Sequence, residues 1–260
     1  MKPICIGLAI WMAVASASQA LADDILNGAG ATFPAPLYQL WLDTFEKETG
    51  IRTDYQGVGS GEGIKRLVGR SVDFGATDAV LTDEELAKVN QPILHMPTCV
   101  GAVAITYNLP GSPTLNFTAD VLADILRGVI VNWSDGRIRA LNPNIRVENL
   151  DITVVHRSDS SGTNFSLTEY LTRTSTAWKV HVGTGKKVKW PVGMGLDGNG
   201  AVARMISHTP GAVGYVSYNY ALENHLPVAA IKNGAGHFVL PSTRSVSLAA
   251  SWSAMRLTRS

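Results

Sequence analysis

The segment at residues 152–171 constrains the fold more than any other part of this chain. Residues 152–155 form a short apolar run that is typical of a buried strand, and apolar residues then recur with helical spacing from 165 to 171. Arg157 therefore ends a strand, and the Ser-Gly-Thr at 161–163 opens a helix whose first N–H groups are unpaired and carry partial positive charge. Such a unit can hold a small anion, although an ordinary capped turn has the same local sequence.

Two earlier segments have the same strand–turn–helix form. The Gly- and Pro-rich residues 28–36 precede a helix whose mostly apolar positions between 37 and 45 share one face, which we expect to be buried. Residues 57–63 form a glycine-rich turn between a strand at 52–56 and a short helix. Both turns offer Ser or Thr beside helix N–H groups, and neither contains the Gly-Lys-Ser/Thr of a nucleotide-binding P-loop.

With residues 72–78 added, these motifs make the chain resemble the PstS family, the periplasmic phosphate-binding proteins of bacterial phosphate transporters. The resemblance runs in order from about Gly28 to Tyr220 and includes Lys189–Gly193 and Gly211–Val216. It implies a type II periplasmic-binding-protein fold, in which two α/β domains surround a ligand cleft. It also implies a monomer without enzyme activity, metal or cofactor, which binds inorganic phosphate with high affinity and delivers it to the permease subunits of an ABC importer.

The resemblance implies a set of phosphate ligands, carried across residue by residue. Hydroxyl groups would come from Thr32, Ser60, Ser161 and Thr163, backbone N–H groups from Phe33, Gly162 and Thr163, and a guanidinium from Arg157. Asp78 would be the one acceptor, and Asp159 would orient Arg157. Hydrogen phosphate has a proton to donate to a carboxylate and sulfate has none, so Asp78 would select phosphate by repelling sulfate.

Two positions depart from the family pattern. Glu62 stands where a small residue is usual, and we expect it to be an exposed first-turn glutamate. Ser160 replaces a common glycine, and a serine is strained there if the position needs a positive φ. The sequence does not determine how either change affects binding, nor the affinity or the identity of the permease.

The resemblance also divides the chain. The expected parts are a signal peptide at 1–22, domain I at 23–97 plus 241–260, and domain II at 98–240. The signal peptide is indicated by Lys2, the apolar run after it and Ala20-Leu21-Ala22, and it predicts a periplasmic protein. Family members continue for roughly another 80 residues, as expected for two domains of typical length. Domain I is therefore expected to be partial, and the sequence leaves open whether the shortened chain folds and binds.

Composition narrows the possible partners. The chain has 22 Lys and Arg residues against 21 Asp and Glu residues, and this balance argues against nucleic acid or a charged membrane surface as partner. Anion capture would then depend on local geometry. Removal of the leader would leave Cys99 as a single cysteine, which cannot form an internal disulfide and is expected to be a buried thiol.

Two alternatives to the phosphate receptor stay open. A secreted phosphate-ester hydrolase would hold phosphate with similar groups, but it needs a nucleophile with a base, or metal ligands. The six histidines show no paired metal-ligand spacing, and His156 and Ser161 are expected on opposite sides of a strand–turn. A truncated, nonfunctional remnant would keep the motifs but lose the scaffold that holds Thr32, Ser60 and Asp78.

Overall fold

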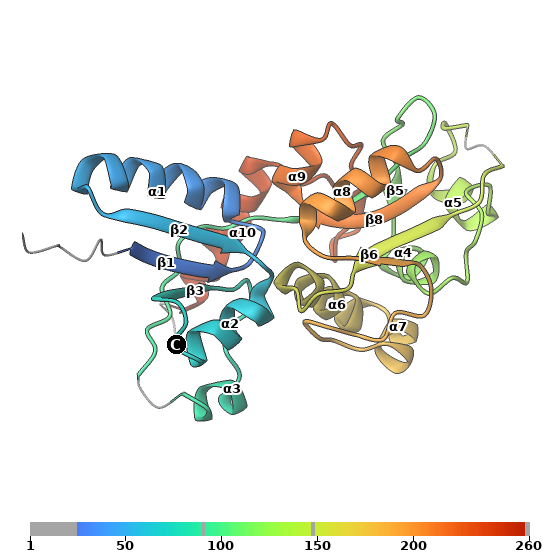
Figure 1. Ribbon diagram of the computed structural model, residues 1–260. Helices are drawn as coiled ribbons and strands as arrows, with labels where there is room; N and C mark the ends of the chain where they lie inside the picture. Colours follow the sequence, from blue (N-terminus) through green and yellow to red (C-terminus); the bar gives the residue numbers. More distant parts are fainter. Residues whose placement is uncertain (1–24, 90–91, 147–148, 258–260) are drawn as a thin grey trace, which may run out of the picture.

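The computed structural model describes residues 25–89, 92–146 and 149–257, so the predicted signal peptide lies outside the described residues. The described chain forms two α/β halves that lie side by side (Figure 1). We call residues 25–89 the first half and residues 103–232 the second half. The mixed α/β class that the resemblance implies is confirmed.

The first half is built on a parallel three-stranded sheet of order β2-β1-β3. Its elements are β1 (Ile25–Gly30), α1 (Ala35–Thr49), β2 (Arg52–Gly57), α2 (Ser60–Val68), β3 (Phe74–Ala76) and α3 (Asp83–Ala87). The chain runs from β1 through α1 to β2, which pairs with one edge of β1. It then runs through α2 to β3, which pairs with the other edge of β1. Because such crossovers are right-handed, α1 and α2 cover opposite faces of the sheet (Figure 1).

The helix expected after residues 28–36 is present as α1, but the expectation that its apolar face is buried is wrong. Pro34 is the N-cap, and Gly50 ends the helix with a φ of 73°. However, none of the residues of α1 is buried, and Trp41 is 46% exposed. The helix contacts β2 near its start, where the ring of Tyr38 packs edge-on against Tyr55 with centroids 5.0 Å apart, and near its end, where Glu46 Oε2 accepts the backbone N–H of Thr53 at 3.3 Å. Helical spacing identifies an apolar face, but it does not supply an element to cover it.

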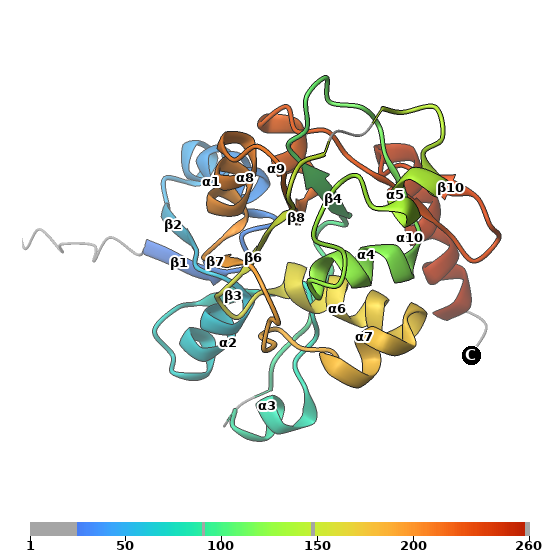
Figure 2. The same cartoon turned by 90° about the vertical axis from the view of Figure 1, so that its right-hand side faces the viewer.

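The second half is built on a four-stranded sheet of order β4-β8-β6-β7, parallel except that β4 runs antiparallel to β8. Its strands are β4 (Val103–Tyr107), β6 (Thr153–Arg157), β7 (Met194–Leu196) and β8 (Ala212–Ser217). Helices cover both faces in the views of Figures 1 and 2. They are α4 (Ala119–Leu126), α6 (Gly162–Thr174) and α7 (Thr176–His181) on one face, and α8 (Asn199–His208) and α9 (Tyr218–Glu223) on the other.

Two hydrophobic clusters fill the second half, one on each face of this sheet. Neighbouring strand residues alternate between them, so Val154 joins the cluster of Trp133 and Trp178, while Val155 joins the cluster under α8. Both valines are buried, which confirms the buried strand expected at 152–155. This packing fixes the end of β6, where Arg157 lies, and the start of α6, where residues 161–163 lie.

Smaller elements complete the described chain. They are α5 (Gly136–Leu141), the sheet of β5 (Asn116–Phe117), β9 (Ala230–Lys232) and β10 (Phe238–Val239), and α10 (Thr243–Leu257). Cys99 is only half-buried, contrary to expectation, because the apolar run around it becomes a strand only at Val103. No helix among the described residues is long and apolar enough to cross a membrane.

Candidate anion-binding site

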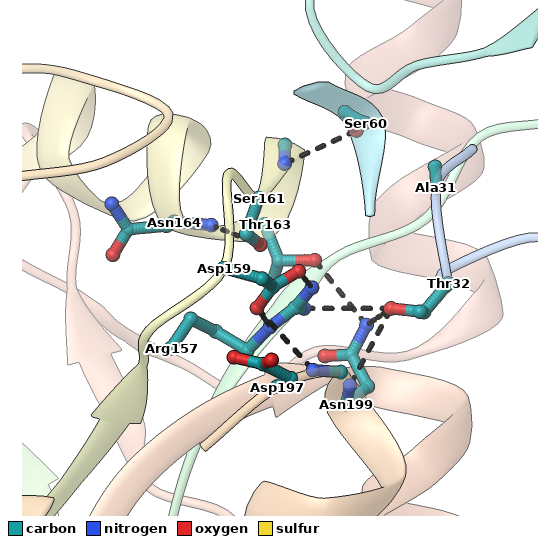
Figure 3. Close-up of polar contacts among 12 residues, drawn as sticks. Ala31, Thr32, Ser60, Arg157, Asp159, Ser161, Thr163, Asn164, Asp197 and Asn199 are labelled. Carbon is teal, nitrogen blue, oxygen red and sulfur yellow. Dashed lines mark hydrogen bonds and ion pairs between the residues drawn. The ribbon is translucent and has the colours of Figure 1, made fainter. Parts of the chain in front are cut away.

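The structure brings the expected donor groups together where strands end and helices begin. Thr32 follows β1, Ser60 opens α2, and residues 161–163 form the start of α6, which follows β6 (Figure 3). Ligands of open α/β sheets bind at this edge, outside the carboxyl ends of the strands. The side chains are almost fully buried, with exposed fractions of 0% for Ser60 and 3% for Arg157.

Arg157 is held from several sides. Its Nε donates to Asp159 Oδ1 at 2.6 Å, and its Nη2 donates to Asp159 Oδ2. The backbone N–H of Arg157 donates to Tyr215 Oη at 3.0 Å, and its Nη1 donates to Thr32 Oγ1 at 3.4 Å. Asp159 therefore holds the plane of the guanidinium by a two-point contact.

The two halves touch directly within the site. The backbone N–H of Gly162 donates to Ser60 Oγ at 3.1 Å, and that of Gly61 donates to the carbonyl of Ser160 at 2.8 Å. A Cβ on Gly162 would lie 2.6 Å from both Ser60 Oγ and the Asp78 side chain. Only a glycine permits this approach of the second half to the first.

Asp78 lies at the edge of a cavity of about 770 Å³ that adjoins the donors. Thr163 and Phe33 also line this cavity, and Thr163 Oγ1 donates to Asp78 Oδ2 at 3.4 Å. The carboxyl group faces the cavity and stays accessible, but the surrounding protein replaces much of its water. This burial raises the pKa of Asp78 to about 6, although Arg157 and the Thr163 hydroxyl both act to lower it.

Asn199 belongs to the site and was missed by the sequence analysis. It is fully buried at the start of α8, and its Nδ2 donates to Thr32 Oγ1 at 2.8 Å and to Thr163 Oγ1 at 3.4 Å. Its Oδ1 accepts the backbone N–H of Ser217 at 2.9 Å. The polar, Gly-containing turn between β7 and α8 could have identified it, since this is a fourth strand–turn–helix unit.

Comparison with known proteins agrees with this geometry. A family model described as "PBP superfamily domain" matches residues 15–256. The phosphate-binding protein PstS of Haemophilus influenzae is 41% identical over 228 residues, which cover 87% of this chain and 68% of the relative. The chain belongs to the PstS family. The PstS protein of Pasteurella multocida is 43% identical over 227 residues, which cover 86% of this chain and 65% of that protein. The chain thus spans about two thirds of the length of these relatives.

A solved structure extends the likeness to the fold. A high affinity periplasmic phosphate-binding protein named PfluDING, determined with bound phosphate, superposes with a TM-score of 0.65 at 26% sequence identity. The match covers 87% of this chain and 67% of that protein. Together with the family model, it confirms the periplasmic-binding-protein fold expected from the sequence.

The structure shows the contacts of Glu62 and Ser160, the two residues that depart from the PstS pattern. Glu62 is half-exposed, and its hydrogen bond with Arg66 at 3.1 Å lowers the pKa of its carboxyl group, with Lys65 contributing from 3.5 Å. Ser160 is not among the non-glycine residues of the described chain with positive φ, so its backbone is not strained. A Cβ on Gly61 would lie 2.0 Å from Ser160 Oγ, so Ser160 packs where a glycine of the first half makes room.

His156, the residue considered as a base for Ser161, has other partners. Its ring stacks on Trp190 with centroids 4.7 Å apart, and its Nδ1 contacts the carbonyl of Arg157 at 3.1 Å. Burial lowers the pKa of His156. Within the described parts of this PstS-family chain, no group of three or more His, Cys, Asp or Glu side chains is placed to hold a metal ion.

Proposed function

We propose that this chain binds inorganic phosphate between its two halves and delivers it to the membrane permease subunits of an ABC importer. The observation that carries the proposal is the convergence of hydroxyls and backbone N–H groups from both halves around the clamped Arg157, with the carboxyl group of Asp78 beside them. The names of the PstS relatives and the phosphate bound in the structural neighbour support this choice of anion.

The hydrogen bonds already present leave the hydroxyl protons of Thr32 and Ser161 available to an anion. Thr32 Oγ1 accepts from Asn199 Nδ2 at 2.8 Å and from the backbone N–H of Asn199 at 3.4 Å, so its two lone pairs are occupied without Arg157 and its proton points elsewhere. Ser161 Oγ accepts the backbone N–H of Asn164 at 3.1 Å as the N-cap of α6, so this hydroxyl acts as an acceptor toward the helix and its proton can be donated to an anion. These hydroxyls would therefore donate to phosphate rather than compete with it for donors.

Phosphate would enter by replacing direct contacts between the halves. It would take the place of the Ser60 to Gly162 contact and of the long Thr32 to Arg157 contact, each half supplying donors to the same anion. Domain I would then be 23–97 with 241–260, domain II would be 98–240, and the ligand would favour the closed arrangement by binding both. Phe33 and Thr163 would add backbone N–H groups, and Asp78 would accept the phosphate proton.

The remaining parts of the proposal follow from family membership. The protein would be exported by the signal peptide at 1–22, act in the periplasm as a monomer, and catalyse no reaction. The relatives are phosphate-binding proteins by name, and the structural neighbour is described as periplasmic. The contacts of His156 with Trp190 and with the carbonyl of Arg157 favour a binding protein over a Ser–His hydrolase.

Calorimetric titration of the chain from Asp23 to Ser260 with inorganic phosphate tests the function. We expect tight binding that an excess of sulfate does not displace. The same preparation should release no product from p-nitrophenyl phosphate. The proposal fails if a cooperatively melting chain gives no heat with phosphate, and sustained turnover of the ester would favour the hydrolase instead.

A further inference from the structure

An ion pair outside the donor cluster joins the two halves. Lys186 Nζ donates to both carboxylate oxygens of Glu85, at 2.7 and 2.9 Å. Glu85 lies on α3 of the first half, and Lys186 lies in the loop that follows α7 in the second half. The side chains are partly buried, with exposed fractions of 27% and 13% respectively, so solvent screens this pair less than a surface pair.

The loop that carries Lys186 is attached to the anion-binding turn. The backbone N–H of Ser161 donates to the carbonyl of Lys186 at 2.9 Å, and Asn164 Nδ2 donates to the carbonyl of Gly185 at 2.9 Å. Thr168 on α6 also exchanges hydrogen bonds with Gly185, at 3.1 and 3.3 Å. The loop therefore moves with the N-terminus of α6, which offers Ser161, Gly162 and Thr163.

Glu85 is equally well fixed on its own side. Its side chain accepts the backbone N–H of Thr82 at 2.8 Å, and Thr82 Oγ1 accepts the backbone N–H of Glu85 at 3.2 Å, a reciprocal capping box at the start of α3. Burial acts to raise the pKa of Glu85, but the contacts with Lys186 and Thr82 outweigh it and lower the pKa. Hydrogen bonds within each half therefore fix the backbone that carries Glu85 and Lys186.

We propose that the Glu85–Lys186 pair is a closure latch that slows the release of phosphate without touching it. The proposal rests on the proposed function. Opening the halves separates the two charges, so the ion pair raises the activation free energy of opening. Phosphate can leave only after the halves open, so its release is slowed. Loss of the pair should raise the dissociation rate about 3- to 10-fold, the range of an ion pair that is only partly screened by solvent.

The test measures release of radiolabelled inorganic phosphate into an excess of unlabelled phosphate. Glu85→Gln keeps an acceptor for Thr82, and Lys186→Met keeps the backbone carbonyl that holds Ser161, so both variants remove the pair and leave the scaffold. Each should release phosphate faster, the double variant should be no faster than either single variant, and Lys186→Arg should restore slow release. Raising the salt from about 0.05 M to about 0.5 M should speed release from the native chain more than from the double variant.

A matched control is Glu169→Gln, which removes the 2.7 Å ion pair with Arg173 on the outer part of α6 and should leave the rate unchanged. The latch is refuted if either single variant releases at the native rate, or if the two effects multiply in the double variant. Small-angle X-ray scattering of the phosphate-free chain tests the effect of the ion pair on closure independently of phosphate binding. The double variant should be more extended than the native chain, and equal radii of gyration would overturn the proposal even where phosphate itself does not bind.

Discussion

Replacing Asp78 by Asn should remove the discrimination between phosphate and sulfate. Asp78 faces the cavity beside Thr163 and has a pKa raised by burial to about 6. When ionised it repels sulfate, which has no proton to share, and when protonated it can donate to sulfate. Phosphate can donate a proton to the ionised group, so phosphate binding tolerates the charge that excludes sulfate.

The pKa of Asp78 sets how strongly sulfate binding should depend on pH. With a pKa of about 6, roughly 90% of Asp78 is protonated near pH 5 and roughly 1% near pH 8. Because apparent affinity scales with the fraction of the competent form, sulfate should bind on the order of 100-fold more weakly near pH 8 than near pH 5. The amide that Asp78→Asn introduces can donate at either pH, so this variant should bind sulfate with an affinity that does not change with pH. Near pH 8 it should bind sulfate on the order of 100-fold more tightly than the native chain.

The assay is displacement calorimetry, with phosphate-loaded protein titrated with sulfate at both pH values. Asp120→Asn is the matched control, because this exposed aspartate in the first turn of α4 lies outside the donor cluster. The sulfate affinity of this control variant should show the same pH dependence as that of the native chain. The reasoning is refuted if Asp78→Asn keeps the native phosphate-to-sulfate ratio near pH 8, or if sulfate binds the native chain equally well at both pH values.

Three further predictions concern the same cluster. Gly162→Ala places a Cβ 2.6 Å from Ser60 Oγ and should weaken phosphate binding about 10- to 100-fold with little change in melting temperature, as titration and calorimetry can check. Asn199→Asp turns the donor to Thr32 into an acceptor that competes for its proton, so phosphate affinity should fall about tenfold or more; native affinity would contradict this. Burial raises the pKa of Asp78 from 3.8 to about 6, so the folded chain keeps this proton where the unfolded chain loses it. Stability should therefore fall as the pH rises from about 4 to about 6, and melts of Asp78→Asn should lack this component.

Local sequence signals predicted the elements that hold the site. Thr82 and Glu85 form a capping box whose Thr-x-x-Glu spacing stands in the sequence, and Ser161 caps α6 after the expected strand. Pro34 and Gly50, residue types that are common at helix ends, bound α1. These features depend on a few adjacent residues whose backbone preferences and hydrogen bonds favour the same conformation, so tertiary contacts do not override them.

Features that depend on distant residues could not be predicted in this way. Asn199 reaches Thr32 across 167 positions, and Lys186 reaches Glu85 across 101. Nothing in the neighbouring sequence of either residue indicates its partner. The face of α1 shows the same limit, because the spacing of Trp41 and its neighbours marks an apolar stripe without showing what covers it. The expected ligand set came from the PstS resemblance, and the structure adds the hydrogen bonds that orient those groups.

A crystal structure of the chain grown with inorganic phosphate tests the central claim most directly. The account predicts one phosphate between the halves, bonded to the hydroxyls of Thr32 and Ser60, the guanidinium of Arg157 and the N-terminus of α6, with a phosphate oxygen within hydrogen-bond distance of Asp78. A phosphate bound elsewhere, or a closed site that keeps the contact between Ser60 and Gly162 at saturating phosphate, would contradict it.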